Sequence, residues 1–419
     1  MDIKITDYGM NGEGVGKLDG KVILVNNTLI GEDVEIELIK DNKNYATAKC
    51  LKVLNKSKSR VAPPCPYFNE CGGCALQHIN YEEQLMFKTL LVKKTLKKVA
   101  NIEFNVSNCV PCDEIFNYRN KSSFNFKDNK SGFFKENSND IVEIDNCLIS
   151  SKNINRIYSL FKYFYLSTKC AQNVKNLVIK DIENQILVGV VANKEIDLSA
   201  FYNALTKEFN QIGLFLVVNT RKDSVVLSGK VKHVGGIKEI KIINFGLTYF
   251  VDLLGFHQTN INIQNKLYNK VLEYILPNTK VVNGFSGQGL LSAIISSKAQ
   301  EVVGIEINKN SHLSAEKLKK DNTICNLTNI CADFNTEIVK HIKNTNTIIL
   351  DPSKKGCGRQ VMEKINGIEN IIYISCNPIA LSKDLRELKN YNIEEIIPFD
   401  MFPNTTSVET LVKLKYKGE

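Results

Sequence analysis

From about residue 246 onwards, short aliphatic runs alternate with longer amphipathic segments, and this rhythm constrains the fold more than any other feature of the chain. The runs are typical of buried strands, and the segments between them have the length and composition of helices. The strands are expected at 281–282, 302–305, 347–350, 371–374 and 411–414, and the helices at 290–299, 311–320 and 381–388. Such alternation predicts an α/β domain with a parallel, doubly wound sheet that binds ligands at the carboxyl ends of its strands.

The chain has 419 residues, which leaves room for further domains before this one. Residues 1–58 contain alternating runs and turns but nothing helical, and we expect a small β domain there. Residues 59–245 mix short strands with helices, among them 81–100, and predict a central α+β domain. No apolar run approaches the roughly 18 residues of a membrane span, and residues 1–7 do not read as an export signal. We therefore expect a cytoplasmic protein.

Cysteines are concentrated at the start of the central region, in the pattern Cys65-x5-Cys71-Gly-Gly-Cys74, and Cys147 follows far downstream. In the cytosol, clustered cysteines indicate metal binding or catalysis rather than disulfides. Three thiols within ten residues, with glycines that allow a tight turn, favour an iron–sulfur cluster completed by a distant cysteine. Zinc held with the help of His78 is the alternative.

A glycine-rich loop opens the doubly wound domain, in the run Asn283-Gly-Phe285-Ser-Gly287-Gln-Gly289 between an expected strand and an expected helix. Glu306 ends the next strand, where a carboxylate can accept a hydrogen bond from a ribose hydroxyl, and Asp333 follows the strand after that, on the adenine side. A nicotinamide cofactor would fit these features. The GxGxG spacing, in place of GxGxxG, favours S-adenosylmethionine.

Reactive side chains stand at three strand ends of the same domain. Asp351 follows one expected strand, Cys376 follows another within Ser-Cys-Asn-Pro, and Glu409 precedes the last aliphatic run. In a doubly wound sheet we expect these positions to converge on one crevice. The crevice would contain a thiol nucleophile, a carboxylate anchor and a candidate base.

Two tracts favour a nucleic-acid partner. Residues 40–60 carry seven cations against one acidic residue, Asp41, and so supply +6 of the net charge of +9. This stripe predicts phosphate contacts, with a solvated face as the alternative. Residues 118–135 interleave five aromatic rings with five cations, a pattern that can stack unpaired bases, although a strand pair is expected to bury about half of the rings.

Taken together, these motifs resemble those of the bacterial RNA uracil-5 methyltransferases, specifically the ribosomal-RNA branch with a TRAM domain and an iron–sulfur cluster. The resemblance covers nearly the whole chain. It implies that residues 1–58 form the TRAM domain, an OB-like β-barrel, that residues 59–245 hold a [4Fe–4S] cluster, and that residues 246–419 form a Rossmann-like methyltransferase domain.

The resemblance also implies roles for individual residues. The cluster ligands would be Cys65, Cys71, Cys74 and Cys147. The donor-binding positions would be Gln258, within Phe256-His-Gln258-Thr-Asn260, together with Phe285, Glu306, Asp333 and Asp351. Cys376 would be the nucleophile and Glu409 the proton acceptor. The chain departs from the family pattern in the glycine loop (Asn283 for Asp, Phe285 for Tyr, Ser286 for Cys), after Asp351-Pro (Ser353, Lys354) and before Glu409 (Asn404, Ser407).

The implied activity is methylation of uracil C5 in 23S ribosomal RNA by S-adenosylmethionine, through a covalent bond from Cys376 to C6. We expect a monomer that binds RNA, and neither DNA nor membranes. A transfer-RNA uridine is the alternative substrate, and a non-catalytic RNA-binding relative is the alternative outside the enzymes. We expect the cluster to organise the central domain without a part in methyl transfer, because its ligands lie far from Cys376 in the sequence.

Overall fold

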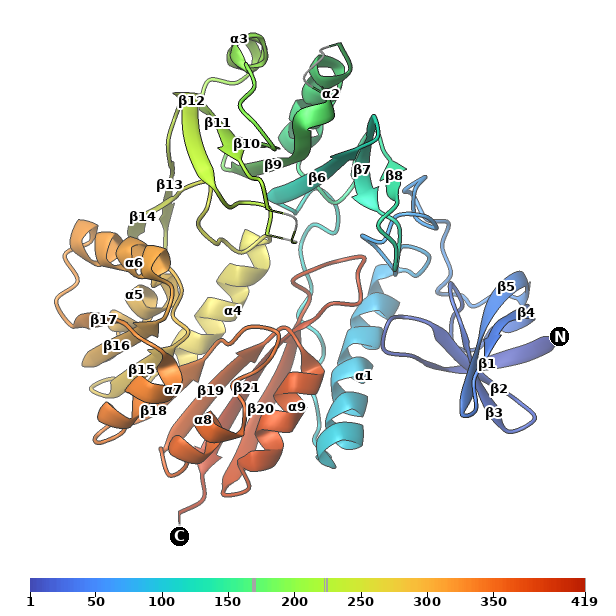
Figure 1. Cartoon of the computed structure of the whole chain (residues 1–419). Helices are drawn as coiled ribbons and strands as arrows, with labels where there is room; N and C mark the ends of the chain where they lie inside the picture. Colours follow the sequence, from blue (N-terminus) through green and yellow to red (C-terminus); the bar gives the residue numbers. More distant parts are fainter. Residues whose placement is uncertain (168–170, 222, 224, 419) are drawn as a thin grey trace.

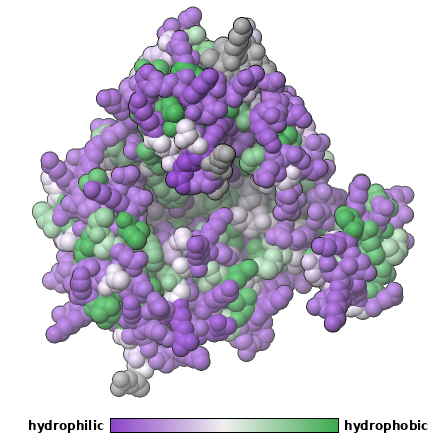
Figure 2. Space-filling view, viewed as in Figure 1, coloured by the Kyte–Doolittle hydropathy of each residue, from purple (hydrophilic) through white to green (hydrophobic). Residues whose placement is uncertain are grey.

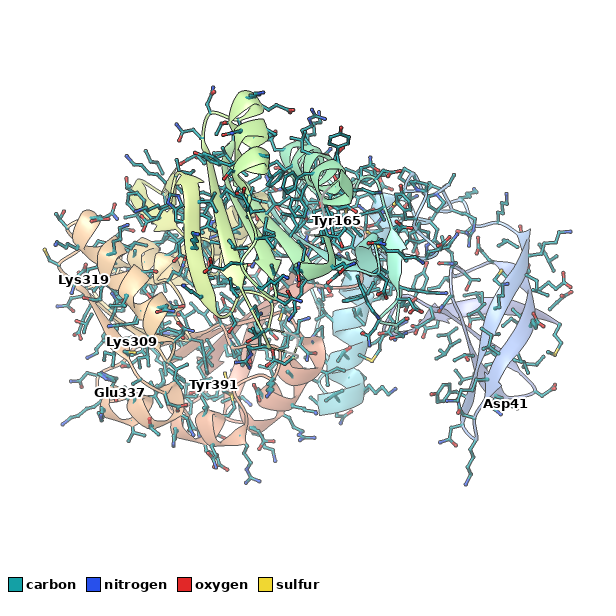
Figure 3. All side chains as sticks on the ribbon, turned by 45° about the horizontal axis from the view of Figure 1, so that its top comes forward. Asp41, Tyr165, Lys309, Lys319, Glu337 and Tyr391 are labelled. Carbon is teal, nitrogen blue, oxygen red and sulfur yellow. The ribbon has the colours of Figure 1, made fainter. Side chains whose placement is uncertain are left out.

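The computed structural model describes residues 1–167, 171–221, 223 and 225–418. Figure 1 shows a barrel at one side, a mixed sheet above and a Rossmann-like sheet below. Figure 3 shows the same separation of the parts, since Asp41 marks the barrel and Lys309 and Lys319 mark a helix at the opposite side of the molecule. Among the described residues, none of the helices has the length and apolar character needed to cross a membrane.

The first strands close into a barrel in the order β1-β2-β3-β5-β4. Their bounds are β1 (Asp2–Tyr8), β2 (Gly14–Leu18), β3 (Lys21–Val25), β4 (Asp33–Asp41) and β5 (Tyr45–Asn55). Alternate residues point inwards, and Ile5, Ile23 and Val34 form its core. The expected β domain is therefore a barrel.

The central sheet has the order β12-β11-β10-β9-β6-β7-β8. Its strands are β6 (Lys121–Lys127), β7 (Lys130–Phe134), β8 (Ile141–Glu143), β9 (Val174–Ile182), β10 (Gln185–Ala192), β11 (Ile212–Val218) and β12 (Lys230–Gly236). Neighbours are antiparallel except β10 and β11, which α3 (Ser199–Glu208) connects. Together with α2 (Lys152–Ser167), α3 covers one face through an aromatic core. A short 3₁₀ turn, η1 (Ala171–Asn173), precedes β9.

The Rossmann-like sheet has the order β17-β16-β15-β18-β19-β21-β20. Its strands are β15 (Lys280–Gly284), β16 (Glu301–Glu306), β17 (Leu327–Cys331), β18 (Thr347–Leu350), β19 (Asn370–Ser375), β20 (Tyr391–Phe399) and β21 (Glu409–Tyr416). The expected all-parallel sheet is wrong at one strand, because β21 is antiparallel to both β19 and β20. The chain moves outwards in opposite directions from β15 and β18, which creates a switch point between them.

Helices cover both faces of this sheet, as expected for a doubly wound fold. One face carries α4 (Ile261–Tyr274), α5 (Leu290–Ser296) and α6 (Lys309–Asp321); the other carries α7 (Phe334–Glu337), α8 (Arg359–Lys364) and α9 (Pro378–Glu387). Val281 points to the first layer and Val282 to the second. The first layer also packs on the hairpin β13 (Ile240–Asn244) and β14 (Leu247–Val251) and on the central sheet, so the two sheets share one core. A 3₁₀ turn, η2 (Ile338–Lys340), follows α7.

Helix α1 (Tyr81–Ala100) joins all three parts. The Asn80 side chain caps its first turn by accepting from Glu83 N at 2.9 Å, and Asn101 ends it in the left-handed region. We expected this helix in the central domain. It packs instead on α9 and contributes Val92 and Leu96 to the Rossmann core. Its other side holds the barrel, since Tyr8 meets Phe87 edge to face at 5.5 Å and donates to Glu83 at 2.9 Å.

Candidate active site

The carboxyl ends of β15, β18 and β19 meet at one edge of the Rossmann-like sheet. Asn283, Asp351 and Cys376 stand at these ends, in the order in which the strands neighbour one another. Glu409 joins them because β21 runs the other way, so that its first residue, and not its last, reaches this edge. The convergence expected from the sequence is present, although it depends on an antiparallel strand.

The glycine loop after β15 needs residues without a Cβ at two places. A Cβ on Gly284 would stand 2.4 Å from the ring of Phe334, and one on Gly289 would stand 2.7 Å from Ala315 of α6, at a φ of +80°. Glu306 holds the loop by accepting from the backbone N–H of Gly287 at 2.9 Å. The loop therefore brings its backbone close to the edge of the sheet.

A cavity of about 700 Å³ lies at this edge, and its wall also includes residues 72–75, part of strand β14 and residues 256–258. Figure 2 shows the molecule hollowed between the upper and lower parts. The cavity wall includes five of the seven predicted catalytic and donor-binding residues: Gln258, Phe285, Asp351, Cys376 and Glu409. Two others are not in the wall. Glu306 adjoins it through Gly287, while Asp333 is exposed and caps α7 by accepting from Thr336 N at 3.2 Å.

Burial dominates the ionisation of the reactive groups. It raises the pKa of Asp351 to about 7, and together with the charge of Asp351 it raises the pKa of Glu409 well above the usual value. These two neighbouring carboxyls, the half-buried Asp351 and the buried Glu409, therefore titrate as a pair. Burial raises the pKa of the Cys376 thiol to about 11; Glu409 and Asp351 add to this effect, and the positive charge of Lys354 opposes it. In this state Cys376 carries its proton at neutral pH.

The loop after Asp351 is held from two points on α9. Asn377 caps that helix by accepting from Ile379 N at 3.1 Å, and its amide donates to the carbonyl of Lys354 at 2.8 Å. Further along α9, the buried Asp384 accepts from the backbone N–H of Cys357 at 2.7 Å and from the Tyr373 hydroxyl at 2.6 Å. The start of α9, which directly follows Cys376, and the loop after Asp351 are thus held together by one helix.

The segment before Glu409 is held by residues that the sequence did not single out. Lys88 of α1 forms a fully buried ion pair with Asp400 and donates to the carbonyl of Phe402 at 3.0 Å. Asn404 exchanges hydrogen bonds with Gln84 of α1, and its carbonyl accepts from the backbone N–H groups of Ala75 and Leu76, each at 3.0 Å. These partners lie more than 300 residues apart in the sequence, where no spacing pattern could connect them.

Four predicted cluster ligands, Cys65, Cys71, Cys74 and Cys147, line a second cavity of about 500 Å³. Burial raises the pKa of the Cys74 thiol to about 12, and the charge of Cys147 adds to the effect. In the described part of the chain, no three His, Cys, Asp or Glu side chains are grouped so that they could hold a metal ion. What the four cysteines share is the wall of this cavity. The zinc alternative is not supported, since His78 is buried beside Phe68 and is not in this wall.

The two cavities share a wall, which is formed by Gly72, Gly73, Cys74 and Arg119. The cysteine-lined cavity therefore adjoins the Cys376 crevice, although the cysteines lie far from Cys376 in the sequence. Distance along the chain says nothing about separation in space when a turn from one region packs on a loop from another.

The aromatic and basic tract at 118–135 forms the hairpin β6–β7, but it does not present five rings to a ligand. Phe124 stacks on Tyr158 with ring centroids 3.9 Å apart, and Phe126 packs on Phe161 edge to face. Among its rings Phe134 is exposed, at 41%. The tract therefore builds the core of the central sheet, and the base-stacking interpretation fails for the buried rings.

The stripe at 40–60 lies on β4, β5 and the segment after them. Its lysines are exposed, whereas Arg60 forms two 2.6 Å contacts with the buried Glu32. The strand register places Lys49 opposite Glu37 and Lys52 opposite Glu35. Acidic residues that precede the stripe in the sequence thus face it in space.

Comparisons with known proteins agree with this architecture. Residues 80–417 match the family model described as tRNA (uracil-5-)-methyltransferase, and residues 1–51 match the TRAM domain. An uncharacterized RNA methyltransferase of Clostridium tetani is 31% identical and covers 100% of this chain and 96% of its own length. A second, from Caldanaerobacter subterraneus subsp. tengcongensis, is 33% identical over 98% of this chain and 96% of its own.

A solved structure extends the likeness to three dimensions. The Pyrococcus abyssi tRNA (uracil-54, C5)-methyltransferase in complex with S-adenosyl-L-homocysteine superposes with a TM-score of 0.82 at 27% identity. The match covers 99% of each chain, so the barrel, the central sheet and the Rossmann-like sheet all take part in it.

Proposed function

The chain belongs to the tRNA (uracil-5-)-methyltransferase family of S-adenosylmethionine-dependent enzymes, and on this premise we propose that it makes 5-methyluridine in 23S ribosomal RNA through a covalent bond from Cys376 to C6 of the uracil. The observation that carries the proposal is the meeting of Cys376, Asp351 and Glu409 in one cavity beside the glycine loop. That arrangement supplies a nucleophile, a donor anchor and a base within a single site.

The residue types fit the chemistry of uracil. C5 is too weak a nucleophile to take a methyl group directly, so the Cys376 sulfur first adds to C6 and converts C4–C5 into an enolate. When bound, the donor supplies an electrophilic methyl group on a cationic sulfur. After C5 has been methylated, Glu409 removes the C5 proton and the Cys376 sulfur leaves C6. Lys354 favours the thiolate that begins this sequence, against the effect of burial.

The wall of the cavity fits an adenosyl donor. The glycine loop brings the backbone of β15 to the cavity, and Glu306 ends the neighbouring strand, where it can accept from a ribose hydroxyl. The proposed donor residues are Gln258, Phe285, Glu306 and Asp351. Asp333 is a weaker candidate, because it caps α7 outside the wall.

The RNA must present an extruded uridine, since C6 cannot be reached in a stacked base, and a loop or single strand makes extrusion least costly. The four thiols beside the cavity support the ribosomal branch. A transfer-RNA uridine is a second candidate, because the structure with the 0.82 TM-score is of an enzyme for uracil-54 of tRNA. Mapping 5-methyluridine in ribosomal and transfer RNA from cells with and without the gene tests both. Loss from 23S RNA is expected; loss confined to tRNA would transfer the activity to the second candidate, and no loss would favour a non-catalytic protein.

The proposal includes a [4Fe–4S] cluster on Cys65, Cys71, Cys74 and Cys147. A cluster takes one thiolate on each iron, and what supports it here is that the four cysteines line one cavity. Protein purified without oxygen should be brown and contain about four irons, and Cys147→Ser should lower the iron content. A colourless protein with one zinc would contradict this part of the proposal.

A further inference from the structure

Two buried amide side chains in the wall of the active-site cavity each leave an oxygen atom unused. They are Gln264 of α4, 2% exposed, and Asn283 at the end of β15, 1% exposed. Gln264 Oε1 and Asn283 Oδ1 have no hydrogen-bond partner among the described residues. A buried carbonyl oxygen without a donor costs free energy, and each such group calls for an explanation.

Both amide oxygens are unpartnered among the described residues, and the nitrogen of Asn283 is already engaged. Asn283 Nδ2 donates to Ser292 Oγ at 2.8 Å. The side chain of Gln264 lies close enough to the phenol of Tyr268 to lower its pKa, against the rise that burial causes. Each oxygen is therefore available as an acceptor for a group that enters the cavity.

The positions of these acceptors indicate which ligand they serve. Asn283 begins the glycine loop on β15, and Asp351 stands on the neighbouring β18. Cys376 and Glu409, which would receive the base, lie on strands farther along the sheet. Tyr268, the partner of Gln264, is close enough to Asp351 for its charge to act on the phenol. The free oxygens therefore belong to the donor side of the cavity.

Two amide oxygens and a carboxyl make three acceptors, and an ammonium group has three N–H donors, whereas a uracil ring offers one. We propose that Gln264 and Asn283, together with Asp351, bind the ammonium group of the amino-acid part of the methyl donor. This inference rests on the proposed placement of the donor in this cavity. It also gives a reason for Asn283, where the family pattern has Asp. An amide keeps the acceptor oxygen and adds no third carboxyl to the pair Asp351 and Glu409.

The test measures binding, separately from methylation. The full-length protein is titrated by calorimetry with S-adenosylhomocysteine, with the analogue that has a hydroxyl in place of the amino group, and with 5′-methylthioadenosine, which lacks the amino-acid part. Gln264→Leu should weaken S-adenosylhomocysteine binding roughly ten- to a hundredfold, because a hydrogen bond to a charged group is lost. Binding of 5′-methylthioadenosine should be unchanged, which also shows that the variant is folded.

Gln264→Glu keeps an acceptor and should restore the preference for S-adenosylhomocysteine over the hydroxyl analogue. Asn329→Ala is the matched control, since its Oδ1 is also unpartnered among the described residues and its Nδ2 is bound to Glu316 at 2.8 Å, but it is not in the cavity wall. It should bind all three ligands like the wild type.

The inference is overturned if Gln264→Leu binds S-adenosylhomocysteine normally, or if it loses that ligand and the hydroxyl analogue by the same factor. Either result is independent of which RNA is methylated. Absence of 5-methyluridine in cells would contradict the proposed function and leave the ammonium site standing.

Discussion

Cys376 and Glu409 can be separated experimentally, because addition at C6 and proton removal at C5 use different residues. Cys376→Ala should abolish both methylation and covalent adducts, since without the sulfur no enolate forms. Glu409→Gln should still allow addition and methyl transfer but should stop before elimination. It should therefore accumulate a methylated RNA–protein adduct on ordinary uridine, visible as a labelled band that resists denaturation. Normal turnover by Glu409→Gln would exclude that residue as the base, and methylation by Cys376→Ala would exclude the covalent route.

Asp351 should lower the stability of the ligand-free protein at neutral pH. Burial raises its pKa from 3.8 to about 7, so the folded state binds more protons than the unfolded state across that window. Stability is therefore lost as the pH rises from about 4 to about 7. Asp351→Asn removes this titration and should melt at a higher temperature than the wild type at pH 8, by about 1 °C for each kcal/mol regained in a chain of 419 residues. The difference should shrink towards pH 4, as measured by thermal unfolding without donor; the same difference at both pH values would refute the linkage.

The positions of Asp351, Cys376 and Glu409 could be predicted from the sequence, because each residue follows or precedes an aliphatic run. The ends of such strands lie at one edge of a doubly wound sheet. The residues that hold these three in place could not be predicted in this way. Asn404 interrupts a familiar motif, yet its importance comes from Gln84 and from the turn at Ala75, which only the folded chain brings near. Asp333 shows the opposite case, since its spacing suggested the adenine side and the structure uses its carboxylate to cap α7.

At the scale of elements, the basic stripe at 40–60 on the barrel predicts how RNA binding depends on salt. Neutralising Lys49, Lys52 and Lys56 should weaken the binding of all RNAs alike and flatten the slope of log K against log salt by about 0.7 for each lost single-strand phosphate contact. Glu35→Gln and Glu37→Gln form the matched control. They remove the opposite charges that face Lys49 and Lys52, and RNA binding should tighten. An unchanged salt slope in the lysine variant would show the stripe to be a solvated face.

The five strands and three helices expected in the Rossmann-like domain are present, whereas β20, α4 and α8 were not expected. Strand direction could not be predicted, since an apolar run has the same pattern whichever way it points. The antiparallel course of β21 is set by its pairing with β19 and β20. Helix α1 was likewise recognised by composition, whereas its place on the Rossmann-like sheet depends on a partner, α9, far away in the sequence. The expectation that the tract at 118–135 buries about half of its rings is confirmed by Phe124 and Phe126 of β6. The sequence could not say which rings these would be, because a buried aromatic strand and a stacking platform share one alternation.

At the scale of the whole molecule, the cysteine-lined cavity and the segment before Glu409 should move together. The carbonyl of Asn404 is held by the turn that follows Cys74, so loosening that turn releases the segment. Cys147→Ser should therefore raise hydrogen exchange at residues 72–76 and also at residues 402–408, although Cys147 is not in the wall of the active-site cavity. Cys325→Ser, at an exposed thiol, is the control and should change neither segment. Faster exchange confined to 72–76 would show that the two cavities are independent.

The placement of β21 determines when a newly synthesised chain can complete its Rossmann-like sheet. This strand comes after all the others of its sheet in the chain, yet it lies between β19 and β20. While the protein is being synthesised, β20 has no neighbour to pair with and the edge of β19 stays open until β21 emerges. Because the same strand brings Glu409, the proposed base, a nascent chain that already contains Cys376 lacks part of the proposed catalytic site. Translation itself thus delays activity until the sheet can close.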